Sequence, residues 1–400
     1  MKTFFISILF LLSLNSQASF LCTQVHQIDY LFGLEFTFSN AQIVSEGNRN
    51  PKAPSLDENP LKKEHWENWL LKIQKKCLAS GDCTTDMGYD KHDRALIVSF
   101  EDGFFFTVGS DSAALEVNAK PYTTQAYHDV LKRMDEYVFK TAKEVGLVPH
   151  DRAGGGHIHI SRKAFEEKTL AFQNFLVDFQ NRPELIYGAL GNHLGNSAPL
   201  AALKPAQRDA FQNLLNDFNP KTSSINELVR RLSNEVFTEG YIADWGHGDY
   251  YQAFNMTRMM NDKNSATLEI RSFRPQESVE AFQLQIYLLE TWVNKIKIMK
   301  EPIPYIRKDR HEYTGQEIVD AYAQLLESLN LPWDRFSVLL PSHLRQMRPK
   351  SAYRSVPYSL NDFATEYKNP NDSSATTDIF KKKVKDKAEE LKSWIDSVLK

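Results

Sequence analysis

Segments with a two-residue apolar period and segments with a helical apolar period follow each other along this chain in irregular order. The two-residue period predicts strands at residues 29–38, 95–99, 103–109, 114–119, 157–161, 250–256 and 266–273. The helical period predicts helices at residues 123–145, 163–180, 206–218, 225–237 and 279–299, one with Trp66, Trp69, Leu70, Ile73 and Cys77 on its buried face, and one after the capping-box pair Thr314 and Glu317. Residues 45–60 show neither period and are predicted to form a surface loop. The chain therefore mixes strands and helices without a repeating unit.

Residues 1–18 have the features of a secretory signal peptide. Lys2 precedes the apolar run 4–14, and Ser16 and Ala18 supply the small residues typical of a cleavage site. We therefore predict cleavage after Ala18 and an exported protein, periplasmic or secreted. A buried N-terminal helix is the alternative, but the run lacks an amphipathic period. No later segment approaches the roughly 20 apolar residues of a membrane helix, so we expect no membrane span.

Beyond the signal peptide the chain divides into a body, a linker and a tail. We expect an ordered body at residues 19–345, a polar linker at 346–377 and an amphipathic, lysine-rich helix at 378–400 that docks on the body or on a partner. The formal net charge of −3, from 48 basic and 51 acidic residues, provides no broad basic field. Nucleic acid is therefore not an expected partner.

Two of the three cysteines lie close together in sequence. Cys77 and Cys83 are separated by a flexible stretch, so they could close a small disulfide loop in an oxidising compartment. Two buried thiols would give the same sequence pattern, and Cys22 has no obvious partner.

The sharpest chemical signal is the glycine run 154–156, which is followed by His157 and His159. Because Ile158 and Ile160 alternate with the histidines, both imidazoles lie on one strand face while the isoleucines enter the core. Neutral imidazole binds divalent metals, and glycines let a ligand approach the backbone, so the pattern indicates a metal or phosphate site. The alternative is two histidines on an ordinary polar surface.

A second signal is the alternation of Glu269, Arg271 and Phe273 onto one strand face. A carboxylate that binds a metal and a guanidinium that binds a transferred phosphate form a natural pair in phosphoryl chemistry, because such a site must neutralise developing charge. A plain ion pair within an exposed strand is the alternative.

Two further carboxylates interrupt apolar strands. Glu35 lies among Phe32, Leu34 and Phe36, and Glu116 lies between Leu115 and Val117. Burial would raise the pKa of such a carboxyl group unless a cation compensates, which makes both residues candidate metal ligands.

These motifs follow the order of a known family. A Gly-x-Glu strand, an Asp followed by Glu-Val, a His-x-His strand and a Glu-x-Arg strand before a long helix resemble the amidoligases. That family belongs to the carboxylate-amine ligase superfamily, which includes glutamine synthetase and the glutamate-cysteine ligases. The resemblance covers residues 30–300. It implies an α+β, glutamine synthetase-like fold in which helices flank an antiparallel sheet.

The resemblance also implies a metal site. Glu35, His157 and Glu269 would bind one magnesium ion that grips the phosphates of ATP, and Glu116 would serve a second metal. The chain departs from the family pattern at Thr37, where family members often carry a second acid.

The remaining implied roles concern the nucleotide and the substrate. Arg271 and Arg274 would neutralise the transferred phosphoryl group, Asn255 would lie near that group, and His159 would face the acyl phosphate or the substrate. The implied reaction uses ATP to activate a carboxylate as an acyl phosphate, which an amine then attacks to form an amide. A metal-dependent hydrolase and an inactive binding module of the same fold are the alternatives. Because ATP is scarce outside the cytoplasm, an exported ligase requires a separate nucleotide source, such as the cytoplasm of a host or prey cell.

Overall fold

The computed structural model describes residues 31–49, 56–90, 93–111, 114–123, 127–149, 155–190, 204–238, 253–260, 266–308 and 313–350. The predicted signal peptide at residues 1–18, Cys22, Gly154 and the predicted C-terminal helix at 378–400 lie outside these ranges, as does the predicted linker beyond residue 350. None of the helices within these ranges is both long and apolar enough to cross a membrane.

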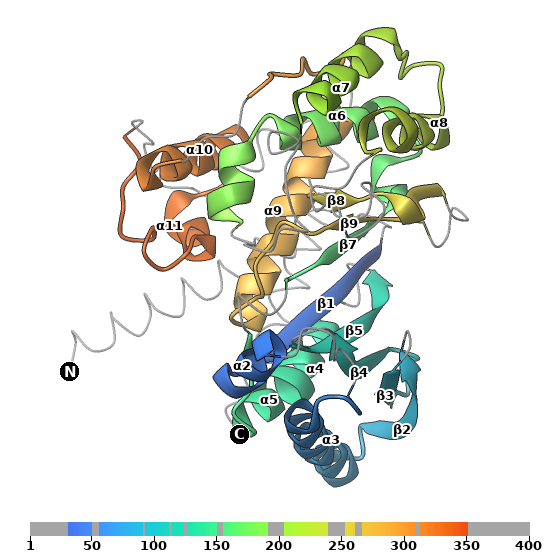
Figure 1. Ribbon diagram of the computed structural model, residues 1–400, viewed down its shortest axis with the longest axis vertical. Helices are drawn as coiled ribbons and strands as arrows, with labels where there is room; N and C mark the ends of the chain where they lie inside the picture. The colour runs from blue at the N-terminus through green and yellow to red at the C-terminus, as the bar shows by residue number, and fades with distance from the viewer. Residues whose placement is uncertain are drawn as a thin grey trace, which may run out of the picture. The chain divides into compact units, whose positions relative to one another are not determined.

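Nine strands of the described residues form one sheet, and every pairing within it is antiparallel. The strands are β1 Leu31–Ser39, β2 Cys83–Asp90, β3 Asp93–Phe100, β4 Phe105–Asp111, β5 Ala114–Thr123, β6 Val148–Pro149, β7 Ile158–Ser161, β8 Phe254–Asn255 and β9 Thr267–Ile270. Their order is β2-β3-β4-β5-β1-β7-β9-β8 (Figure 1). The short β6 also pairs with β1. The predicted α+β class is confirmed.

The helices are joined by short π-helical and 3-10 turns. The α-helices are α2 Ala41–Arg49, α3 Pro60–Ser80, α4 Tyr127–Arg133, α5 Lys140–Glu144, α6 Thr169–Gln180, α7 Pro205–Asp217, α8 Ile225–Arg231, α9 Val279–Lys297, α10 Gly315–Ser328 and α11 Trp333–Phe336. The π-helical turns are η2 Met134–Phe139, η4 Leu185–Ala189 and η7 Leu232–Val236, and the 3-10 turns are η3 Arg162–Phe165, η8 Thr257–Met260 and η9 Ser337–Leu339.

The sheet has one apolar face and one polar face, as the alternation in β1 dictates. Phe36 packs edge-on against Phe139 of η2 and Phe282 of α9, each at a centroid distance of 5.2 Å, and Phe38 packs against Trp69 of α3 at 5.1 Å. These aromatic contacts attach the helices to the apolar face of β1. The residues that alternate with the phenylalanines point to the other face, which carries the candidate site.

Several predicted elements have different limits in the structure. Part of the loop predicted at 45–60 is helical, because α2 runs to Arg49 and the Asn40 side chain accepts hydrogen bonds from the backbone N–H groups of Gln42 and Ile43. The single helix predicted at 163–180 is interrupted, since Glu166 and Glu167 take left-handed conformations with φ of 51° and 56° between η3 and α6.

Two predicted strands are present but are shorter in the structure than in the prediction. The strand predicted at 250–256 is described only from residue 253 and pairs only at Phe254–Asn255, and the one predicted at 266–273 ends its ladder at Ile270. Thr123, predicted to begin a helix, instead ends β5. Cys77 and Cys83 form a disulfide, with Cα atoms 5.0 Å apart.

Candidate metal centre

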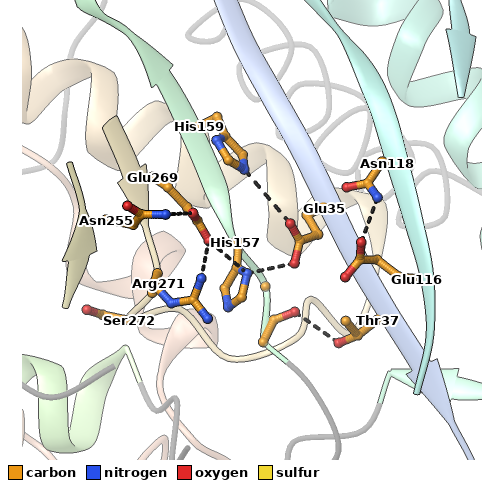
Figure 2. Close-up of polar contacts among 12 residues, drawn as sticks. Glu35, Thr37, Glu116, Asn118, His157, His159, Asn255, Glu269, Arg271 and Ser272 are labelled. Atoms are coloured by element: carbon orange, nitrogen blue, oxygen red, sulfur yellow. Dashed lines mark hydrogen bonds and ion pairs between the residues drawn. The ribbon is translucent and has the colours of Figure 1, made fainter. Parts of the chain in front are cut away.

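Three of the predicted ligands meet on the polar face of the sheet. Glu35 comes from β1, His157 immediately precedes β7, and Glu269 lies on β9, and these strands are neighbours in the order β1-β7-β9. Each residue offers one donor atom, and these atoms all lie within 4.8 Å of one another (Figure 2). The predicted convergence of Glu35, His157 and Glu269 is therefore present in the structure.

The pairing register explains why residues so far apart in sequence come together. Glu269 lies opposite His159 across β9 and β7, and His159 lies opposite Gly33 across β7 and β1. Partners in an antiparallel ladder point to the same face, so Glu35 and His157, each two residues from this row, point to that face as well. The backbone N–H of Glu35 donates to the His157 carbonyl oxygen over 3.2 Å, which fixes the two ligands side by side.

The three side chains are almost completely buried. Nδ1 of His157 lies 2.7 Å from Oε1 of Glu35 and 3.2 Å from Oε1 of Glu269, and no more than a tenth of any of these side chains is exposed. Although these distances are short, neither ring nitrogen of His157 makes a well-directed hydrogen bond with the described residues. Nδ1 of His157 and one oxygen of each carboxylate thus converge at one buried point.

Both carboxylates of the group are held in their ionised form. Burial alone would raise the pKa of Glu35, but the adjacent His157 and then His159 hold that pKa well below its usual value. Burial and the charge of Glu35 would raise the pKa of Glu269, yet Arg271 first and the two histidines next outweigh them and lower that pKa. Two ionised carboxylates therefore lie side by side at a position where little water can screen them.

The donor set and its spacing fit a divalent cation. Oxygen and nitrogen ligands lie about 2.0–2.6 Å from magnesium, zinc or calcium, so two donors on one ion are separated by at most about 4–5 Å. The 4.8 Å limit of the group meets this requirement. Two carboxylates and one imidazole suit magnesium, manganese or zinc, and a neutral His157 would leave a net negative site that such an ion neutralises.

Glu269 is held from both sides by residues that were predicted to bind the nucleotide. Nδ2 of Asn255 donates to Oε2 of Glu269 over 2.8 Å, and Nη1 of Arg271 donates to Oε1 over 2.6 Å. The amide of Asn255 is oriented in turn, because its Oδ1 accepts from the backbone N–H and hydroxyl of Thr257 at 3.0 and 2.6 Å. In this structure Asn255 therefore acts on the metal site through Glu269.

His159 lies at the margin of the group. Its Nε2 atom is 3.8 Å from Oε2 of Glu35, and its side chain is more exposed than that of His157 (Figure 2). This position suits a residue that meets a substrate beside the metal site.

Glu116 lies outside the group. It is buried on β5 opposite Thr37, which lies two residues after Glu35 on β1. Its Oε1 accepts a hydrogen bond from Asn118 over 2.6 Å. Thr37, the position where the family often has an acid, instead donates its hydroxyl to the Gly155 carbonyl oxygen over 2.9 Å. The described residues therefore do not gather a second ligand set around Glu116.

Arg274 also points elsewhere. It is offset by an odd number of residues from Glu269 and Arg271, and its guanidinium donates to the Leu340 carbonyl oxygen and lies 3.4 Å from the Glu277 carboxylate. These contacts connect the segment after β9 to the region that follows α11.

Sequence reasoning missed the roles of four residues in or near the centre. Thr257 orients Asn255, Asn118 binds Glu116, Thr37 binds Gly155, and Gln276 donates its amide to the Gly156 carbonyl oxygen over 3.2 Å. The two-residue period after Glu35 and Glu116 places Thr37 and Asn118 on the same strand faces and could have identified them. Thr257 and Gln276 lie outside strands, and no periodic signal marks them.

Comparison with known proteins adds no further assignment, since the chain matches no model of a protein family and no curated protein.

Proposed function

We propose that this protein is an ATP-dependent carboxylate-amine ligase with a glutamine synthetase-like sheet, and that Glu35, His157 and Glu269 bind its divalent cation. The observation that carries the proposal is the bond between Arg271 and Glu269. A metal-site carboxylate and a buried guanidinium stand together at one point, with Nη1 and Oε1 only 2.6 Å apart. Many enzymes that transfer a phosphoryl group from a nucleotide combine a metal cation with a positively charged side chain.

The residues of the centre have separate roles in this proposal. Magnesium, bound by Glu35, His157 and Glu269, would supply the charge that neutralises the nucleotide phosphates. Arg271 would contact a phosphoryl oxygen, because the planar guanidinium group matches the geometry of phosphate. His159, beside Glu35 and partly exposed, would contact the substrate carboxylate or the incoming amine.

The reaction is amide formation in two steps. The substrate carboxylate takes the terminal phosphoryl group of ATP, giving an acyl phosphate and ADP, and the amine then displaces phosphate. Arg274 has no role in this proposal, because its guanidinium is engaged with Leu340 and Glu277.

A metal-dependent hydrolase is the second candidate. One imidazole and two carboxylates form a three-ligand set, and catalytic zinc sites commonly use three protein ligands and leave one position for water. This reading gives no role to Arg271, which is why we place it second.

A turnover screen of the purified protein separates the candidates. With magnesium, ATP and panels of acids and amines, a ligase forms ADP only when the acid is present and turns over repeatedly when the amine is added, whereas a zinc hydrolase acts without ATP. Glu269→Gln should abolish ADP formation, and Glu327→Gln, at an exposed position of α10, should not. Binding of magnesium and ATP without turnover of any acid and amine pair would favour an inactive binding module instead.

A further inference from the structure

The backbone that carries His157 is held by a set of contacts that differs from the sheet ladder. The paired register of β7 ends at Ile158, which lies opposite Leu34 on one side and Ile270 on the other. His157 is therefore one residue beyond the last paired position, and the ladder alone does not fix its side chain.

Four hydrogen bonds hold the backbone of Gly155, Gly156 and His157 instead. The Gly155 carbonyl oxygen accepts from the Thr37 hydroxyl at 2.9 Å, and the Gly156 carbonyl oxygen accepts from Nε2 of Gln276 at 3.2 Å. The Gly156 N–H donates to the Phe273 carbonyl oxygen at 2.9 Å, and the His157 carbonyl oxygen accepts from the Glu35 N–H at 3.2 Å. Each of the three residues before β7 is thus bound to β1 or to the segment after β9.

Thr37 and Gln276 are the two side chains in this set, and both are 2 % exposed. Burying a hydroxyl or an amide is unfavourable unless it is hydrogen-bonded, and valine at position 37 would suit a strand equally well without that cost. The polar groups at these two positions are therefore best explained by the glycine carbonyls that they bind.

Gly156 shows how closely the segments approach each other. A Cβ atom at this position would lie 2.3 Å from the Arg274 carbonyl oxygen and 2.4 Å from Nε2 of Gln276, so only glycine fits. Because the segment that covers Gly156 follows Glu269 directly along the chain, the contact sets His157 relative to Glu269. The Thr37 contact does the same relative to Glu35, two residues earlier on β1.

We propose that Thr37 and Gln276 are positioning residues of the metal centre, which clamp Gly155 and Gly156 and thereby fix the His157 imidazole between Glu35 and Glu269. This inference rests on the metal centre of the proposed function. Thr37 thus serves the single ligand group of Glu35, His157 and Glu269 by shaping its backbone.

Calorimetric titration of the purified protein with Mn²⁺ tests the clamp. Thr37→Val keeps the shape of the side chain and removes the hydroxyl, and Gln276→Met removes the amide, so each should weaken Mn²⁺ binding by about tenfold or more. Thr37→Ser restores the hydroxyl and should bind within about threefold of the wild type. Thr84→Val is the matched control, because Thr84 is exposed on the distant edge strand β2 and should leave the affinity unchanged.

A purely structural role would produce a different result. In that case Thr37→Val would lower the melting temperature in EDTA yet bind Mn²⁺ as tightly as the wild type, and this outcome would overturn the inference. If Thr37→Val does not fold, wild-type affinity in Gln276→Met overturns it equally.

A Glu269→Gln titration separates the clamp from the centre itself. Loss of binding in Glu269→Gln together with wild-type binding in Thr37→Val refutes the clamp alone. A wild-type protein that binds no Mn²⁺, or a Glu269→Gln variant that binds normally, refutes the centre and the clamp with it.

Discussion

Asn255 and Glu269 lie opposite each other on β8 and β9, and Nδ2 of Asn255 donates to Oε2 of Glu269 over 2.8 Å. Because Thr257 fixes the opposite end of the amide, the donor cannot rotate away from the carboxylate without losing two further hydrogen bonds. The orientation of one candidate metal ligand is therefore built into the turn that follows β8.

Asn255→Ala should loosen this ligand. We expect metal affinity to fall about tenfold, as for other residues that orient a ligand from behind. Leaving a buried carboxylate oxygen without its donor should also cost about 1–3 kcal/mol of stability. Titration with Mn²⁺ and urea unfolding measure the two effects. Thr257→Val should weaken metal binding less than Asn255→Ala, because Thr257 acts on Glu269 only through Asn255. A larger loss of affinity in Thr257→Val would contradict this arrangement.

Arg271 should separate metal binding from catalysis. Arg271→Met removes a positive charge next to the centre, so Mn²⁺ should bind as tightly as before or more tightly, while ADP formation should fall by about 100-fold or more. Arg271→Lys keeps the charge but not the planar fork and should recover only part of the rate. Weaker metal binding in Arg271→Met would argue that its role is only to orient Glu269.

Metal removal should destabilise the protein. At a free ion concentration of about 100 times the Kd, a bound ion adds about 2.7 kcal/mol to the free energy of unfolding. The melting temperature with magnesium or manganese should therefore be higher than the melting temperature in EDTA. His157→Ala should abolish this rise. His343→Ala, at an exposed position, should preserve it.

The sequence predicted those parts of the fold in which one face of an element is buried. The apolar positions of α3 and α9, and the alternation in β1 and β7, follow directly from contact with the core. The edge strand β2 was missed because Thr84, Asp86 and Tyr89 are exposed, so burial imposes no period on it. Helix α2 follows the capping residue Asn40, and Ile43 is a buried apolar residue of this helix, so a cap rather than an apolar period marks α2 in the sequence.

The sequence predicts which face of each strand carries the candidate site residues, but it does not predict how the strands align with one another. Glu35 and Glu116 occupy the same face of adjacent strands, as their alternation indicated, but Glu116 pairs with Thr37 and Asn118 pairs with Glu35. A register two residues different would have placed the two acids opposite each other. The order β5-β1-β7-β9 and this register depend on contacts between distant segments, such as the bond between Thr37 and Gly155, 118 residues apart.

One asparagine within α6 and one directly after it hold an extended segment, residues 301–306, and they allow a prediction about stability. Asn174 of α6 donates to the Glu301 carbonyl oxygen at 2.9 Å and accepts from the Ile303 N–H at 2.8 Å. Asn181, one residue past the end of α6, does the same with Pro304 and Ile306 at 3.0 and 2.7 Å. Because the two asparagines are seven residues apart, about two helical turns, both amides lie on the same side of the helix. Asn174 binds residues 301 and 303, and Asn181 binds residues 304 and 306.

Replacing either asparagine by alanine removes two hydrogen bonds at a buried position, so Asn174→Ala and Asn181→Ala should each lower the free energy of unfolding by about 1–3 kcal/mol. Urea unfolding measures this loss, and faster amide exchange at residues 301–306 should accompany it. Asn213→Ala, at an exposed position in α7, is the matched control and should change stability by no more than about 0.5 kcal/mol. Because none of these four hydrogen bonds involves Glu35, His157 or Glu269, both variants should bind Mn²⁺ with the affinity of the wild type. A loss of Mn²⁺ binding in either variant would show that residues 301–306 also support the candidate metal centre.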